Sequence, residues 1–462
     1  MEQLDTILST LADYVWSAPF ALLLLGTGIF LSFRLLFIQV RGFWHGVAVV
    51  SGKYDDPAHK GQLTHFQALS AALSATIGIG NIGGVATAIY YGGPGAVFWM
   101  WVSAAFGMAI KYTSCTLAVK FRKIDDDGNV RGGPMYFIEL GMGKWFKPLA
   151  YMFAACTAIA AFGAGNMVQS NTVAHSLVDA FHVTPEMEGL WRWIIGFVIC
   201  GMVGVVIIGG IKRIGHVASW LVPFMSVMYV GSGLIVLALN VGAILPALKM
   251  IFYHAFNPTA ATGGFLGVGV MKTIEWGLKR GLFSNESGLG SAPMAHSTAR
   301  VDEPVREGLV AMLGPFIDTI VICSMTALVI IVSGQWNSGI NGAPLTASAF
   351  NAVLPVFGQW MVVIAIILFA YSTVISWSYY GEKGIEYLAG SRAKPAYRWV
   401  YITFTLIGAR LDLKAAWSFA DIANALMAIP NLVALIGLSG AIVTITRKYF
   451  TEKAQGLQRP YR

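Results

Sequence analysis

Two glycine-rich runs decide the fold of this chain: Ala75-Thr76-Ile77-Gly78-Ile79-Gly80-Asn81-Ile82-Gly83-Gly84 and Gly281-Leu282-Phe283-Ser284-Asn285-Glu286-Ser287-Gly288-Leu289-Gly290-Ser291. Each run lies in the middle of a long apolar segment. A glycine in a helix interior costs about 1 kcal/mol relative to alanine, so each run marks a place where a helix unwinds. Close packing of helices through small residues explains some of the glycines. It does not explain Asn81, Asn285 and Glu286, because polar groups are expensive inside an apolar layer.

The composition places these segments in a membrane. The chain has 462 residues, of which 56% are apolar and 12% are charged, whereas a typical soluble domain carries about 25% charged residues. This supply of charge cannot cover the surface of a soluble protein of that size. The chain has no charge-rich low-complexity tract, heptad repeat or Gly-X-Y period, which excludes a disordered chain, a coiled coil and collagen. The sequence therefore predicts an all-α polytopic membrane protein.

Eleven apolar runs are candidate membrane spans, since a helix needs about 20 mainly apolar residues to cross a bilayer. They lie at 17–39, 66–93, 95–119, 149–178, 193–211, 217–244, 264–299, 308–333, 355–381, 399–410 and 419–446. The tenth run is short. The N-terminal segment is acidic and has no basic n-region or small-residue cleavage site, so we expect the first run to remain as a helix rather than to be a signal peptide.

The lysines and arginines fix the predicted orientation. With eleven spans, 22 of the 31 basic residues fall on one side of the membrane and 4 on the other, which is a strong positive-inside signal. We therefore expect the N-terminus outside and the tail, 447–462, in the cytoplasm. The net charge of +8 is then mostly a cytoplasmic collar, and we predict no nucleic-acid partner.

The two interrupted runs lie in the second and seventh predicted spans, five spans apart. Helices separated by an odd number of spans cross the membrane in opposite directions. The pattern predicts a single transport domain over 1–462, with an extra N-terminal helix (17–39) followed by two inverted five-helix repeats (66–244 and 264–446). In such proteins paired broken helices hold substrate and ions near the midplane. Their free N–H groups suit a carboxylate and their free carbonyls suit a cation.

Motifs along almost the whole chain, about 20 to 445, resemble a known family. They are Gly78-Ile79-Gly80-Asn81, Gly92-Gly93-Pro94-Gly95-Ala96, Gly132-Gly133-Pro134-Met135-Tyr136, Gly165-Asn166-Met167-Val168-Gln169, Ser284-Asn285-Glu286, and Tyr371-Ser372-Thr373 through Trp377-Ser378-Tyr379-Tyr380-Gly381-Glu382. Together they look like the alanine or glycine:cation symporters of bacteria and archaea. The resemblance implies a leucine-transporter-like core in the cell (inner) membrane that imports small neutral amino acids with sodium by alternating access. One departure is Ile79, where the family often has Thr or Ser, so carboxylate recognition would rest more on backbone amides.

The candidate substrate site combines both broken spans with polar positions in the fourth and ninth spans. We expect amides near Gly78–Gly80 to bind the amino-acid carboxylate. Gln169 could bond the carboxylate or the ammonium group, or only bridge two helices. By the resemblance, the indole of Trp377 limits the size of the substrate side chain. The candidate substrate-binding residues are Thr76, Gly78, Ile79, Gly80, Gln169, Phe283, Asn285, Thr373 and Trp377.

A sodium site is expected beside the substrate, because hard oxygen ligands suit a small cation. Hydroxyls of the ninth span with carbonyls of the second span would form such a site, unless those hydroxyls bond carbonyls of their own helix. Asp318, alone in the eighth span, is an ion ligand, a proton carrier or the partner of a basic residue. The candidate sodium ligands are Ser74, Ile77, Asn81, Ser372, Thr373, Ser376 and Asp318.

Other functions fit the sequence less well. A proton-coupled symporter would use Asp318 or Glu286 and would keep working without sodium. An enzyme is disfavoured, since the chain has no His-Glu-x-x-His, phosphate loop or paired Asp motif, and His65, His175 and His296 are isolated in the sequence. A passive channel would favour a symmetric pore lining over two dissimilar interruptions. We expect sodium as the coupling ion and no other cofactor; the oligomeric state and the preferred amino acid stay open.

Overall fold

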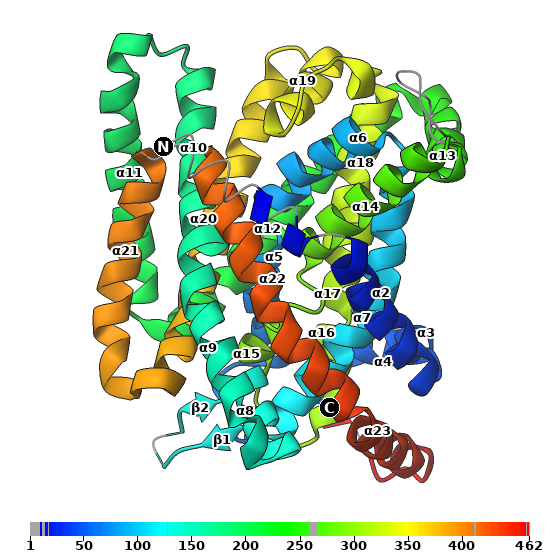
Figure 1. Cartoon of the computed structure of the whole chain (residues 1–462), viewed down its shortest axis with the longest axis vertical. Helices are drawn as coiled ribbons and strands as arrows, with labels where there is room; N and C mark the ends of the chain where they lie inside the picture. Colours follow the sequence, from blue (N-terminus) through cyan, green and yellow to red (C-terminus); the bar gives the residue numbers. More distant parts are fainter. Residues whose placement is uncertain are drawn as a thin grey trace.

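The computed structural model describes residues 10–11, 14–16, 18–126, 128–257, 266–410, 413–458 and 460–461. Within these ranges the chain is mostly helical, and its strands form one antiparallel hairpin of β1 (Lys123–Ile124) and β2 (Val130–Arg131). Figure 1 shows long helices side by side, with the hairpin at one end of the bundle. The predicted helical class is confirmed.

The helices of the first half begin with a short peripheral group and continue into long spans. They are α2 (Ala18–Arg34), α3 (Ile38–Arg41), α4 (Phe43–Ala48), α5 (His65–Thr76), α6 (Val85–Gly92), α7 (Ala96–Lys120), α8 (Pro134–Phe137), α9 (Lys147–Phe162), α10 (Val168–Ala180), α11 (Pro185–Ile207), α12 (Gly210–Leu239) and α13 (Val241–Phe256). Those of the second half are α14 (Leu266–Asn285), α15 (Ala292–His296), α16 (Pro304–Ala311), α17 (Leu313–Pro315), α18 (Ser324–Val332), α19 (Ala343–Val353), α20 (Phe357–Ala389), α21 (Lys394–Arg410), α22 (Leu413–Gly437) and α23 (Ser439–Ala454).

Six helices in the described ranges are long and apolar enough to cross a membrane, and two bent helix pairs qualify if each pair is one span. The six are Ala96–Lys120, Lys144–Ala180, Pro185–Ile207, Gly210–Leu239, Pro304–Val332 and Phe357–Ala389. The count of eleven and the inverted repeat stay predictions. Residues 17, 264 and 265 of the predicted spans, and Arg459 and Arg462 of the predicted tail, lie outside the described residues.

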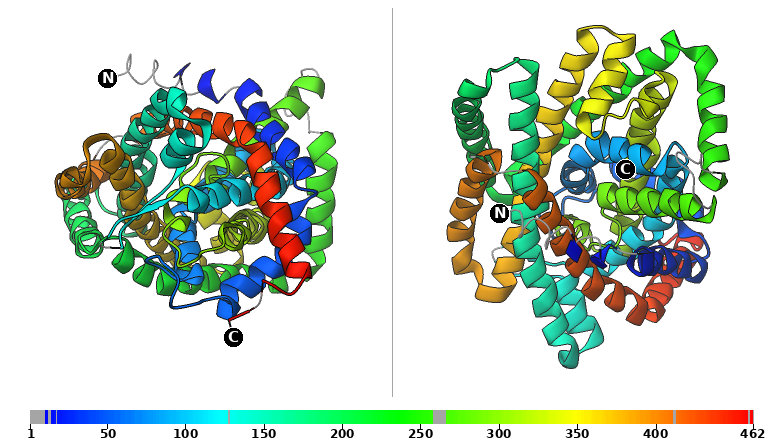
Figure 2. Two further views of the ribbon diagram at one scale, coloured as in Figure 1. Left: turned by 90° about the horizontal axis from the view of Figure 1, so that it is seen from below. Right: turned by 45° about the horizontal axis from the view of Figure 1, so that its top comes forward.

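Local sequence explains the first break. Helix α5 begins with a capping box, in which the Thr64 hydroxyl accepts from the Gln67 amide and the Gln67 side chain accepts from the Thr64 amide. It ends at Thr76, because Ile77 takes an extended conformation with φ −75° and ψ 92°. The chain resumes 55° off the axis of α5. This broken span, blue in Figures 1 and 2, runs through the interior of the bundle, and the predicted interruption is confirmed.

The second break follows α14. Glu286 has a positive φ of 54°, and Gly288 and Gly290 follow with φ of 99° and 85°. These left-handed conformations end the helix. Gly288 and Gly290 adopt them without steric cost, because glycine has no Cβ. Helix α15 then begins at Ala292. The interruption predicted for this run is therefore confirmed as well.

Three π-helical segments interrupt the spans around the breaks. They are η2 (Gly80–Gly84), which precedes α6, η5 (Gly163–Met167), which joins α9 to α10, and η6 (Phe316–Cys323), which joins α17 to α18. A π-helix bonds residue i to residue i+5, and such turns are frequent at functional sites. The three segments therefore mark the region in which a site is expected.

The last predicted span, 419–446, differs from the structure. Helix α22 ends at Gly437, and α23 begins at Ser439 at an angle of 61° to it. Figure 1 shows α23 leaving the line of α22 at the foot of the molecule. The apolar run is continuous across this bend, which is why the pattern alone did not reveal it. Helices α13 and α19 also lie in segments that the sequence analysis left as connections.

Candidate functional site

A small cavity lies where the two breaks meet η5, α10, α20 and α22. Its volume is about 20 Å³, room for about one water molecule. Seven predicted substrate residues line it: Thr76, Gly78, Gly80, Gln169, Phe283, Thr373 and Trp377. Five more residues line it that were not among the candidate substrate-binding residues: Ala75, Ala164, Ser284, Glu286 and Asn424. The sequence analysis named Glu286 only as a candidate proton carrier, and it gave no role to Ala75, Ala164 or Asn424. Asn424 is an amide within an apolar run, the same signal that singled out Asn81.

Asn81 holds the first break in place. Its side-chain oxygen accepts from the Gly78 amide at 2.8 Å, and its Nδ2 donates to the Asp318 carboxylate at 2.6 Å. Its backbone carbonyl accepts from the Thr326 hydroxyl at 2.8 Å. The side chain is fully buried. Asn81 thus satisfies one backbone donor released by the unwound segment and fixes the segment to η6.

Gln169 of α10 reaches the same segment from the other side. Its Oε1 accepts from the Ile79 amide at 3.4 Å, and its Nε2 donates to the Ala164 carbonyl at 3.0 Å. Ile79, a predicted substrate-binding residue, does not line the cavity. It contacts Gln169 through its backbone amide. A donor and an acceptor of the glutamine are therefore engaged around the break.

Five oxygen atoms converge between α5 and α20. The Ser372 hydroxyl lies 3.1 Å from the Ser74 carbonyl, 3.3 Å from that of Ile77 and 2.8 Å from that of Phe369. The Thr373 hydroxyl lies 3.4 Å from the Ile77 carbonyl and 3.0 Å from that of Phe369. Two hydroxyls and three carbonyls form a neutral set of hard oxygens. Such a set suits a small cation.

Asp318 lies in a second polar cluster, on the far side of Asn81. Its carboxylate accepts from Asn81 Nδ2, from the Ser284 hydroxyl at 2.9 Å and from the Thr319 hydroxyl at 2.8 Å. The residue is fully buried. No ion pair to it occurs among the described residues. Its hydrogen-bond donors are neutral, and the buried Lys111 ammonium attracts it electrostatically. A buried carboxylate is expensive inside a membrane and marks a functional group.

Glu286 brings a second carboxylate to the edge of the cavity. Its Oε1 accepts from the Trp377 indole N–H at 2.9 Å and its Oε2 accepts from the Ser291 hydroxyl at 2.5 Å. The indole packs tightly against η5, because a Cβ at Gly165 would lie 2.3 Å from the Trp377 Cβ. The Trp377 side chain is therefore held at its N–H by the Glu286 carboxylate and packed against the backbone of Gly165, which has no side chain.

Two predicted site residues are placed elsewhere. Asn285 is fully buried but does not line the cavity; its Nδ2 contacts the Thr319 hydroxyl at 3.2 Å and its Oδ1 accepts from the Ser287 amide. Ser376 lies one helical turn from Ser372, and its hydroxyl has no hydrogen-bond partner in the part of the chain that the structure describes. Neither residue belongs to the cavity or to the five-oxygen set.

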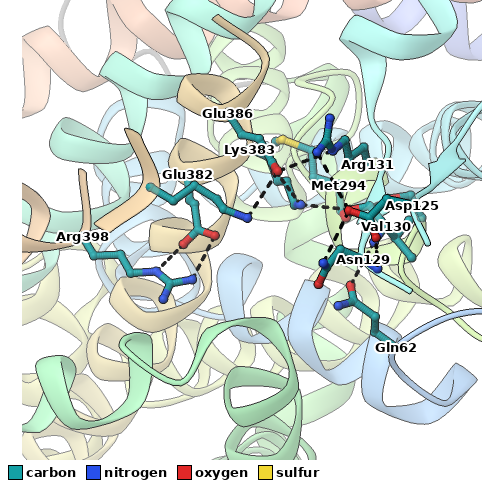
Figure 3. A network of polar contacts seen from close by, with 12 residues as sticks. Gln62, Asp125, Asn129, Val130, Arg131, Met294, Glu382, Lys383, Glu386 and Arg398 are labelled. Carbon is teal, nitrogen blue, oxygen red and sulfur yellow. Dashed lines mark hydrogen bonds and ion pairs between the residues drawn. The ribbon is translucent and has the colours of Figure 1, made fainter. Parts of the chain in front are cut away.

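Polar contacts join the β1–β2 hairpin to the C-terminal end of α20. Figure 3 shows Lys383 of α20 between Glu386, at 2.7 Å, and the Val130 carbonyl of the hairpin, at 2.9 Å. The Arg398 guanidinium makes two bonds to the Glu382 carboxylate, at 2.6 and 3.0 Å. A hairpin that follows α7 is thus fixed to the C-terminal end of α20.

These features define a class of protein: a helical membrane protein whose two interrupted spans meet at a buried polar cavity. The overall structure is similar to the crystal structure of MhsT in complex with L-phenylalanine, with a TM-score of 0.59 over 82% of this chain and 90% of that chain at 14% identity. At that identity the likeness concerns the fold alone.

The sequence comparisons are more specific. The chain matches the sodium:alanine symporter family over residues 1–462. It is 46% identical to the sodium/alanine symporter AgcS of Methanococcus maripaludis, covering 96% of this chain and 97% of that protein. It is 36% identical to the putative sodium/proton-dependent alanine carrier protein YrbD of Bacillus subtilis, covering 97% and 93%. The chain therefore belongs to the sodium:alanine symporter family, as the motifs indicated. It is a multi-pass membrane protein and a sodium-coupled amino acid transporter, not an enzyme.

Proposed function

We propose that this transporter imports small neutral amino acids, alanine and glycine foremost, together with sodium by alternating access. The observation that carries the proposal is the five-oxygen set of α5 and α20, which shares Thr373 with the cavity. A cation bound by the Ser74, Ile77 and Phe369 carbonyls and the two hydroxyls would draw α5 and α20 together. Sodium and amino acid then stabilise the same closed arrangement, which couples their movement.

The polar groups of the cavity suit an amino acid in one orientation. The Gly78 amide is engaged by Asn81, so the donors that the unwound segment would offer to the carboxylate are the amides of Ile79 and Gly80. The long contact of the Ile79 amide with Gln169 would give way when substrate binds. Glu286 supplies the negative charge that an ammonium group requires at the other break. The buried Lys111 ammonium of α7 attracts the carboxylates of Glu286 and Asp318 electrostatically, without a direct ion pair to either among the described residues. One cation thus serves two carboxylates, and we propose that the substrate ammonium supplies the second positive charge, beside Glu286.

The size limit on the substrate follows from the walls. Phe283 and Trp377 are large and buried, and the remaining lining includes alanines and glycines whose backbones approach closely. The cavity of about 20 Å³ is smaller than any amino acid, so the pocket expands on binding. A small expansion admits glycine or alanine and excludes a branched or aromatic side chain.

The Asp318 cluster supports a second ion. Asp318, Asn81 and Ser284 form an anionic set of oxygen-bearing groups close to the first break. We propose that this set takes a second sodium ion. A proton on Asp318 or Glu286 is the competing proposal, favoured by the burial of both carboxylates. The two are distinguished by uptake without sodium.

We also propose the predicted topology for the whole chain: an extra N-terminal helix, two inverted five-helix repeats, the N-terminus outside and the tail in the cytoplasm of a bacterial or archaeal cell. The cytoplasmic side is then the side of the β1–β2 hairpin and α23. Accessibility of single cysteines placed in the hairpin and in α13 to an impermeant reagent tests this assignment.

The function is tested by uptake into proteoliposomes. Labelled alanine, glycine and leucine are supplied with and without an inward sodium gradient. We expect sodium-dependent uptake of the first two, and loss of it in Ser372→Ala. The matched control is Ser378→Ala on the same helix, whose hydroxyl donates to the Ile375 carbonyl of its own helix and to no other group in the described ranges. Uptake that ignores sodium would contradict the ion assignment, and no uptake of any small amino acid would contradict the substrate class.

A further inference from the structure

A buried carboxylate bridges two histidines on the cytoplasmic side of the site. Glu307 of α16 contacts His65 Nδ1 with Oε2, and its Oε1 lies 2.5 Å from His296 Nδ1. All three side chains are at most 1% exposed. Sodium and substrate binding as proposed above use none of them.

The three residues join both broken spans. His65 is the first residue of α5 and His296 is the last residue of α15. The carboxylate therefore ties together the two half-helices that lie between the substrate cavity and the cytoplasm. If α5 is to move away and open a path for release, its bond to Glu307 must break.

Backbone contacts meet at the same place. A parallel bridge joins Leu63 to Ala299, with the Gln62 amide donating to the Thr298 carbonyl at 2.8 Å and the Arg300 amide donating to the Leu63 carbonyl at 2.7 Å. The Arg122 guanidinium then donates to four carbonyls of the two connected segments: Lys60, Ser297, Ala299 and Val301. The cluster is thus the titratable part of a larger junction.

Few other charged or titratable groups of the described residues face the cluster. From the loop before α5, the Asp55 carboxylate lies 3.8 Å from His65 Nε2 and is about a third exposed, at 32%. From α7 and the residues after it, the Cys115 thiol and the Arg122 guanidinium interact with Glu307. Nε2 of each histidine has no hydrogen-bond partner in the described ranges. Asp55 is partly exposed and lies beside His65 Nε2, so it is the group from which we expect a proton to reach the ring.

We propose that His65, Glu307 and His296 form a proton-binding site that latches the inner halves of the two broken spans, so that cytoplasmic acid holds the inner gate shut. The proposal rests on the importing function above for its effect on uptake, but not for the latch itself. A neutral histidine donates Nδ1–H to the carboxylate as an ordinary hydrogen bond. A proton added at Nε2 makes the ring a cation, and the same contact becomes charge-assisted and about twice as strong.

Breaking the protonated contact is costly for a second reason. It would leave a buried imidazolium and a buried carboxylate apart, and separating a buried ion pair is strongly unfavourable. One proton changes the charge of the three groups from −1 to 0, with Asp55 available to stabilise it. The latch therefore tightens in acid and loosens in base.

The test uses variants that keep the hydrogen bond and lose the titration. In His65→Asn and His296→Asn the asparagine amide places its N–H donor where histidine has Nδ1, but it cannot take up a proton. His59→Asn is the matched control, because His59 lies in the same cytoplasmic loop and contacts Asp56 and Asp302 instead.

Hydrogen exchange of residues 62–70 reports the opening of α5 directly. In the purified wild-type protein, after correction for intrinsic exchange, we expect opening to increase about tenfold from pH 6 to pH 8, as a charge-assisted bond is replaced by a neutral one. The same increase is expected in His59→Asn, and a nearly flat profile in the two latch variants. A flat wild-type profile, or an unchanged profile in both latch variants, would overturn the proposal.

Uptake provides the second arm. With the outside held at pH 7, acidifying the vesicle interior from pH 8 to pH 6 should slow sodium-driven alanine uptake several-fold in the wild type and little in His296→Asn. Equal slowing in both would overturn the link between latch and gate. A wild-type protein that shows the exchange profile but transports no small amino acid would retain the latch and contradict only the proposed function.

Discussion

Gly78→Ala should weaken sodium binding and leave the rest of the protein unchanged, because the added methyl group meets a residue of the proposed sodium site. A Cβ on Gly78 would lie 2.6 Å from the Thr373 hydroxyl oxygen and 3.4 Å from Gln169 Oε1. Gly78 does not adopt a positive φ, since it is absent from the residues with that conformation. Alanine therefore fits the backbone here, and the effect of Gly78→Ala comes from the clash alone.

The magnitude follows from what Thr373 must give up. Its hydroxyl has to rotate away from the Phe369 and Ile77 carbonyls, which it contacts at 3.0 and 3.4 Å. Losing a hydrogen bond costs about 1 kcal/mol, and an off-rotamer side chain costs about 1 kcal/mol more. If the loss of this ligand oxygen costs sodium binding the total of about 2 kcal/mol, the affinity for sodium falls roughly 30-fold. We expect the sodium concentration for half-maximal uptake to rise by that factor.

A double-mutant cycle with Thr373→Ala tests the reasoning. If the clash is the whole effect, Gly78→Ala/Thr373→Ala has the sodium affinity of Thr373→Ala alone, because the hydroxyl that is displaced is already gone. Gly84→Ala is the control in the same segment, since its Cβ would meet nothing closer than the Arg280 side chain at 4.0 Å. Additive effects in the cycle, or an equal loss in Gly84→Ala, would refute the mechanism.

Three further predictions follow from other contacts. Asn81→Ala leaves the Gly78 amide and the Asp318 carboxylate each without a partner, so thermal unfolding in detergent should show a loss of about 3 kcal/mol; no loss would contradict the role of Asn81. Trp377→Phe removes the N–H donor to Glu286 and shortens the ring, so competition uptake should show weaker alanine binding and acceptance of valine; unchanged selectivity would remove Trp377 from the pocket wall. Burial, with Lys453 and Arg306 nearby, lowers the pKa of His45 from 6.5 to about 4. The unfolded chain binds this proton first, so stability should fall as the pH drops from about 6.5 to about 4. His45→Gln should flatten that part of the melting-temperature profile, and an equally steep profile would refute the assignment.

The breaks could be predicted from the sequence because their signals are local. Glycine within an apolar run weakens a helix wherever it occurs. A polar side chain such as that of Asn81 is costly to bury in a membrane and usually has a function there. Four of the five oxygens of the set, those of Ser74, Ile77, Ser372 and Thr373, were also among the predicted sodium ligands. The Phe369 carbonyl was not, because a carbonyl inside an apolar helix leaves no signal in the sequence.

The contacts between distant segments could not be predicted in this way. Asn285 and Glu286 are adjacent in the sequence, yet only Glu286 borders the cavity, because the left-handed turn after Asn285 sends the two side chains in different directions. His65 and His296 are isolated in the sequence and share one carboxylate in the structure. Such pairings depend on how the helices are rotated against one another, and a hydropathy pattern carries no information on that rotation within a fully buried span.

The number of residues in each π-helical segment determines which side chains face the pocket. Each bonds over five residues where an α-helix bonds over four, so each accommodates one residue more than the same rise of α-helix. Removing a single residue from Gly163–Met167 would let the segment revert to an α-helix and turn everything after it by about 100°. Gln169 would then face away from the break that it contacts at 3.4 Å. A one-residue deletion, which a loop usually tolerates, would here remove side chains from one wall of the site. A one-residue deletion in η2 or η6 would rotate the residues after it in the same way. The number of residues in these turns is therefore as much a determinant of transport as the residues themselves.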